Sequence, residues 1–191
     1  MTLNLNNISF KQINTFIHVY HIPYLHDYLL SFKEYFIFEF KKFKEVTENL
    51  GDYDGNNLIL SEEKIYKIFE TIINKHYIVD SNWEVGKNIG IYLQIQTPKS
   101  NKNTYHNHTP SAIAATTYIN PPLENEGGEL QLYLHEHQQV KLSLEKDCLY
   151  FFPGWMMHRP LPQNTTKERI CINWSYDSSK RPIHKLTGDR W

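Results

Sequence analysis

The spacing of hydrophobic residues in the first part of the chain predicts helices. Between residues 24 and 48, apolar and aromatic residues recur three and four positions apart with charged residues between them, which indicates one amphipathic helix or two with a break. Turn-forming residues occupy 51–57, and Ser61 then caps a second predicted helix that has Glu62 and Glu63 in its first turn. The apolar stripe of this second helix consists of Ile65, Ile68, Phe69, Ile72 and Ile73. We therefore expect a helical N-terminal layer over about 1–80.

From about residue 83 the hydrophobic pattern changes to a period of two. Residues 89–96 alternate strictly between apolar and polar side chains, as one strand with a buried face does. Further strand candidates are 112–120, 129–134, 140–144, 148–152 and 169–176. Short strands separated by turn residues predict a sandwich or barrel rather than parallel βαβ units. The expected fold class is mostly β with N-terminal helices (α+β).

Length and composition narrow the function classes. A chain of 191 residues with 40% hydrophobic residues has the size of a single domain. Within it we expect the β core at about 83–177 and a solvated tail at 178–191. The formal net charge of −1 argues against a general nucleic-acid binder. The sequence has no apolar run long enough for a membrane span, no signal-peptide pattern and only two cysteines, so we expect a cytoplasmic protein.

Histidines are frequent, and three of them have the spacing of metal ligands. His106 and His108 are two residues apart, which on a strand places both imidazoles on one face. His158 follows an apolar strand and a Pro-Gly turn, so a second strand can bring a third imidazole to the same place. His135 and His137 form a rival pair, but they lie in a polar run that we interpret as an exposed strand end.

An arginine begins the last predicted strand. Alternation places Arg169, Cys171 and Asn173 on one face of that strand and apolar side chains on the other. An arginine inside an apolar barrel is costly unless it meets an anion, and its planar fork suits a carboxylate. The alternative is an arginine exposed at the edge of a strand.

The order of these motifs resembles that of the iron(II)/2-oxoglutarate-dependent dioxygenases, in particular small phage and bacterial members with a histidine-rich first motif. The residues at 106–108 stand where the family has His-x-Asp/Glu, and 149–158 are similar to its strand that ends in the distal histidine. Residues 111–120 and the Gly-Gly-Glu-Leu segment at 127–130 match two further family segments, and Arg169 matches the arginine that holds 2-oxoglutarate. The resemblance covers about 90–176.

The resemblance implies a fold, a site and a reaction. The fold is a double-stranded β-helix (jelly roll) with the helices packed on its major sheet. His106, His108 and His158 would hold Fe(II), and Arg169 the far carboxylate of 2-oxoglutarate. Further candidates for the cosubstrate pocket are Cys171, Tyr92, Gln94 and Thr116, of which Tyr92 and Gln94 can equally face solvent. With O2, such an enzyme hydroxylates a C–H bond of a small molecule or side chain and converts 2-oxoglutarate to succinate.

One departure from the family pattern concerns charge, because His108 stands where the family has a carboxylate. A neutral imidazole there makes the ferrous site one charge more positive; alternatively, His108 does not bind the metal and water fills the position.

Two other functions stay open. A cupin-type metalloenzyme would carry a Glu four or five residues after the second histidine, where this chain has Ala112 and Ile113. A non-enzymatic jelly-roll binding protein is the other alternative.

Overall fold

The computed structural model of the protein describes residues 3–13, 16–38, 41, 57–59, 63–76, 89–96, 104–109, 111–134, 138–167 and 169–177. These residues are mostly β, as the alternating pattern predicts, and their strands form two sheets of seven and three strands. Among them, no helix has the length and apolar character needed to cross a membrane.

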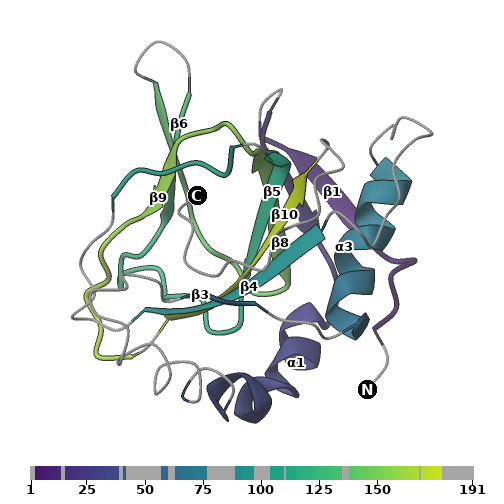
Figure 1. Cartoon of the computed structure of the whole chain (residues 1–191). Helices are drawn as coiled ribbons and strands as arrows, with labels where there is room; N and C mark the ends of the chain where they lie inside the picture. The colour runs from purple at the N-terminus through teal and green to yellow at the C-terminus, as the bar shows by residue number, and fades with distance from the viewer. Residues whose placement is uncertain are drawn as a thin grey trace.

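The larger sheet forms the middle layer of the molecule (Figure 1). Every neighbouring pair in it is antiparallel. In order across the sheet, the strands are β1 (Ser9–Gln12), β2 (His18–His21), β8 (Cys148–Pro153), β5 (Ser111–Tyr118), β10 (Arg169–Asp177), β4 (Ile89–Gln96) and β3 (Asn57–Ile59).

The smaller sheet packs on one face of the larger one. Its strands, in order, are β7 (Gln139–Leu142), β6 (Leu130–Tyr133) and β9 (His158–Pro160). Leu130 and Leu132 of β6 share a buried cluster with Tyr118, Phe152 and Cys171 of the larger sheet. The two sheets therefore form a β-sandwich whose interior lies between β6 and the centre of the larger sheet.

Helices cover the opposite face of the larger sheet (Figure 1). Helix α1 spans Leu25–Leu30 and helix α3 spans Glu63–His76, and residues 33–38 are also helical. Phe69 of α3 stacks on Phe151 and Trp174, with ring-centroid distances of 5.2 and 6.0 Å. Phe36 is buried in the same cluster, as expected from the helical spacing, whereas Phe40 lies outside the described residues.

The structure differs from the sequence-based expectation in the N-terminal part. The predicted helix over 24–48 is interrupted at residues 31–32, and strands β1, β2 and β3 lie within the stretch expected to be helical. Strand β2 is short, and it owes its conformation to pairing with β8 and to the contact of Tyr20 with Phe151, at 5.0 Å between ring centroids. Such distant pairing has no local signal. Residues 42–50 and the tail at 178–191 lie outside the described residues.

Candidate metal centre

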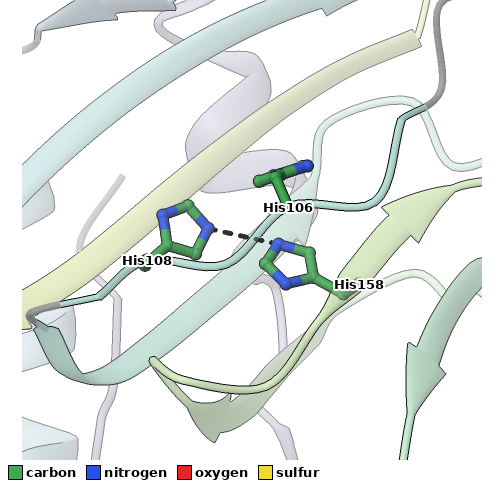
Figure 2. Close-up of side chains that lie close together, drawn as sticks. All are labelled: His106, His108 and His158. Atoms are coloured by element: carbon green, nitrogen blue, oxygen red, sulfur yellow. Dashed lines mark hydrogen bonds between the residues drawn. The ribbon is translucent and has the colours of Figure 1, made fainter. Parts of the chain in front are cut away.

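Three histidines from two distant parts of the chain meet beside the sandwich interior (Figure 2). His106 and His108 belong to the segment that leads into β5, and His158 is the first residue of β9. One ligand nitrogen from each of the three lies within 4.8 Å of the others, and the Nε2 atoms of His108 and His158 are 3.2 Å apart. We call these residues the histidine triad.

Backbone contacts bring the two segments of the triad together. His106 and His158 form an antiparallel bridge in which each amide donates to the carbonyl of the other, at 3.0 and 2.8 Å. The amide of His108 donates to the carbonyl of Gly154 at 2.7 Å. A Cβ atom on Gly154 would lie 1.9 Å from the carbonyl oxygen of Ser111, so only glycine permits this approach.

Further hydrogen bonds orient two of the imidazole rings. His158 Nδ1 lies 2.9 Å from the carbonyl oxygen of Met156, and His106 Nδ1 lies 3.2 Å from that of Thr104. Because a carbonyl only accepts, each Nδ1 must carry the proton, and each Nε2 then presents a lone pair. Such a bond from the second ring nitrogen is the usual way in which proteins orient a metal-binding histidine.

The electrostatics of the triad favour neutral imidazoles. Loss of water around the imidazole rings lowers the pKa of all three histidines, that of His108 to about 3 and that of His158 well below its ordinary value of 6.5, although the side chain of His106 stays partly in contact with solvent. Two imidazoles that bind one metal at about 2.0–2.1 Å have nitrogens about 3.0–3.4 Å apart, which agrees with the His108–His158 separation. The donor set therefore fits a divalent transition metal.

Arg169 lies inside the sandwich, as alternation along β10 predicts. Its side chain is only 2% exposed, and its Nη1 donates to the carbonyl oxygens of Gly128 at 2.5 Å and Leu161 at 3.3 Å. Gly128 has a φ of +82°, and a Cβ there would lie 2.9 Å from Arg169 Nη1. The Gly-Gly pair before β6 thus leaves room for a buried guanidinium.

The other predicted pocket residues share register with β10. Cys171 pairs with Gln94 of β4, and its Sγ lies 3.5 Å from Gln94 Oε1; burial raises the pKa of the thiol to about 11, so it stays protonated. Thr116 pairs with Asn173 and is buried. Tyr92 of β4 also lies opposite Asn173, but its side chain is not among the described ones. The rival histidine pair, His135 and His137, lies outside the described residues.

Sequence reasoning missed one buried residue of this region, Tyr118. It pairs with Cys171 across β5 and β10 and is 4% exposed, and burial raises the pKa of its hydroxyl while the charge of Arg169 acts in the opposite direction. The alternation of Ala114, Thr116 and Tyr118 on one face of β5 is the signal that could have identified it.

Comparison with known proteins identifies the fold but no family. No protein family model matches the sequence, and no curated protein matches it. Among solved structures, a prolyl 4-hydroxylase from Phytophthora capsici aligns with a TM-score of 0.52 and 18% identity, over 73% of this chain and 53% of that one. This likeness shows a shared fold.

Two further structures align less well. A prolyl-4-hydroxylase from Pseudomonas putida gives a TM-score of 0.46 and 16% identity over 60% of this chain and 59% of its own. A viral collagen prolyl hydroxylase from Paramecium Bursaria Chlorella virus-1 gives a TM-score of 0.45 and 18% identity over 72% of this chain and 82% of its own. The chain thus spans little more than half of the Phytophthora capsici and Pseudomonas putida proteins.

Proposed function

We propose that the protein is an iron(II)- and 2-oxoglutarate-dependent oxygenase that hydroxylates a C–H bond of a small molecule or a side chain. In this proposal the sandwich is a double-stranded β-helix, the histidine triad holds Fe(II), and Arg169 binds the far carboxylate of 2-oxoglutarate. The observation that carries the proposal is the convergence of three neutral imidazoles beside a sandwich interior that also contains a buried arginine.

Two independent features support this function. The motifs occur in the family's order, from His106 to Arg169, and they belong to one sandwich: His158 begins β9 of the smaller sheet, Arg169 begins β10 of the larger sheet, and His106 and His108 precede β5. The fold is shared with a prolyl 4-hydroxylase, so a hydroxylation reaction has a precedent on this scaffold. Because fold alone does not establish chemistry, the histidine triad and Arg169 carry the assignment.

The chain's residues would bind and orient the reacting groups. Bound Fe(II) would supply oxygen activation coupled to decarboxylation of 2-oxoglutarate. The Met156 carbonyl keeps His158 in the tautomer that presents Nε2 to a metal, and the carbonyls of Gly128 and Leu161 hold the guanidinium of Arg169 in place. The protonated thiol of Cys171 is a weak donor, so in this proposal Arg169 supplies most of the attraction for the cosubstrate carboxylate.

An anaerobic titration of the apoprotein with Fe(II) and 2-oxoglutarate tests the proposal. We expect the visible charge-transfer band of a metal-chelated keto acid. The band should be absent from His106→Ala and His158→Ala, and present in the matched control His21→Ala, since His21 is an exposed histidine on β2. Arg169→Lys should keep the band but saturate at a higher concentration of 2-oxoglutarate, because lysine lacks the bidentate fork.

Two other outcomes of the titration would favour a different function. Binding of iron without the band would point to a cupin-type metalloenzyme that does not use 2-oxoglutarate. If the protein bound no iron, a non-enzymatic jelly-roll binding protein would be the better description.

A further inference from the structure

The histidine triad contains no anionic ligand. His108 stands where the resembled family has a carboxylate, and the sequence has no Asp or Glu between Lys99 and Pro122. Within the described part of the chain, the group that can hold a metal consists of the three histidines alone, with no carboxylate or thiol joining it. A divalent ion in this place would therefore keep both of its positive charges.

The surroundings make this uncompensated charge costly. His158 is 5% exposed and belongs to the buried wall of the sandwich, and Phe152 packs against its ring at a centroid distance of 4.7 Å. On this side of the triad water cannot solvate the net charge of two, and a counter-ion bound directly to the metal is the most effective compensation. A site with one carboxylate ligand would already have half of this compensation.

The geometry also leaves space for such an anion. Three protein ligands leave further positions on a metal ion free for exogenous ligands. His106 is exposed and His108 is partly exposed, so one side of the triad is accessible from solvent, whereas His158 closes the other side. A small anion can therefore reach the metal without passing through the core.

We infer that the metal-loaded histidine triad binds a small monovalent anion, such as a halide or azide, as an additional metal ligand, and that this anion competes with 2-oxoglutarate. This inference rests on the proposed function, because it requires a metal at the triad. The dianion 2-oxoglutarate offers more compensating charge and two donor atoms, so it displaces the small anion. Replacing one imidazole with a carboxylate removes half of this charge deficit and so weakens the binding of the anion.

The test uses the full-length protein loaded with Co(II), whose visible absorption reports its ligands, and sodium azide as the probe at constant ionic strength set with perchlorate. Wild type, His108→Asn and His108→Asp are compared. Asn and Asp have the same shape and both offer oxygen, but only Asp is charged. We expect azide to change the cobalt spectrum of wild type and of His108→Asn with similar affinities, and to bind His108→Asp about tenfold or more weakly.

A competition measurement completes the test. Adding 2-oxoglutarate should raise the apparent dissociation constant for azide in wild type in proportion to its concentration. His106→Asp repeats the charge comparison at a second ligand position in case His108→Asp does not retain cobalt, and circular dichroism confirms that each variant is folded.

The outcomes separate this inference from the proposed function. If wild type takes up no Co(II), the metal site and hence the proposed function are wrong. If Co(II) binds but azide leaves the spectrum unchanged, or binds both Asp variants as tightly as wild type, the inference is overturned while the metal site stands.

Discussion

At the scale of single residues, the candidate site contains two imidazoles, those of His106 and His158, whose orientation is set by hydrogen bonds to backbone carbonyls. His158 is held by the Met156 carbonyl through Nδ1, and its Nε2 is directed toward that of His108. A neutral His108 that carries its proton on Nε2 donates to His158 Nε2 at 3.2 Å. A metal bound to the triad would take the place of this shared proton.

Burial of the His158 imidazole makes the stability of the apoprotein depend on pH. The pKa of His158 in the folded state is well below 6.5, whereas the unfolded chain titrates near 6.5, so stability is present above that pH and is lost as the pH falls below it. The contribution of this one group between about pH 7.5 and pH 5.5 is about 1 kcal/mol. We expect His158→Gln to make the free energy of unfolding, measured with urea at both pH values without metal, less dependent on pH by that amount. An unchanged dependence would contradict the buried neutral state.

At the scale of secondary-structure elements, the turn before β6 and strand β10 determine how Arg169 is held. The carbonyl of Gly128 accepts from Nη1, and the absence of a side chain on Gly128 leaves room for the guanidinium. The turn therefore positions the guanidinium of Arg169, which in the proposed function binds 2-oxoglutarate.

Gly128→Ala should selectively weaken 2-oxoglutarate binding. The new Cβ would approach Arg169 Nη1 to 2.9 Å on a backbone with a φ of +82°, so the guanidinium must shift. We expect about a tenfold loss in 2-oxoglutarate affinity, which is about 1.4 kcal/mol, because the displaced guanidinium would meet the cosubstrate carboxylate with poorer geometry, and we expect little change in Fe(II) affinity. Titration of the charge-transfer band measures both constants. Glu124→Ala, on the same connection, is the control and should behave as wild type.

Helix α3 should contribute mainly to stability. Phe69 is fully buried and stacks on Phe151 and Trp174, on the face of the sheet opposite the triad. Phe69→Ala removes these contacts and leaves a cavity, at a cost of about 3–5 kcal/mol. Urea denaturation measures this loss, and Lys67→Ala on the exposed face of α3 should change stability by less than about 0.5 kcal/mol. A loss of similar size in both variants would contradict the packing described.

At the scale of the whole molecule, the triad joins parts of the sandwich that are distant in sequence. His158 begins β9 of the smaller sheet, while His106 and His108 lead into β5 of the larger sheet. A metal bound to all three would therefore link the two sheets at this edge, and the folded state would gain stability that the unfolded chain lacks.

Metal addition should accordingly raise the melting temperature. At a free metal concentration of a hundred times the dissociation constant the gain is about 2.7 kcal/mol, which corresponds to about 5–10 °C for a chain of this length. Differential scanning calorimetry with Co(II), and its reversal by a chelator, measures the effect. His158→Ala should show no shift, and an equal shift in that variant would place the metal elsewhere.

The sequence by itself determined the β part of this protein and which residues are candidates for its chemistry. Strict alternation predicted β4 and the inward direction of Arg169, because a strand repeats every two residues whatever its partners are. The helical spacing predicted that Ile65, Phe69 and Ile72 are buried, for the equivalent reason in a helix. These features follow from local periodicity.

Only the tertiary structure decided which of these residues meet. Strands β1, β2, β3 and β9 are short and become strands through their partners, so no local pattern announced them. The convergence of His106 and His108 with His158 depends on an antiparallel bridge between residues 52 positions apart and on the close approach of Gly154 to Ser111. Contacts between distant segments are set by packing of the whole chain, which spacing along the sequence does not encode.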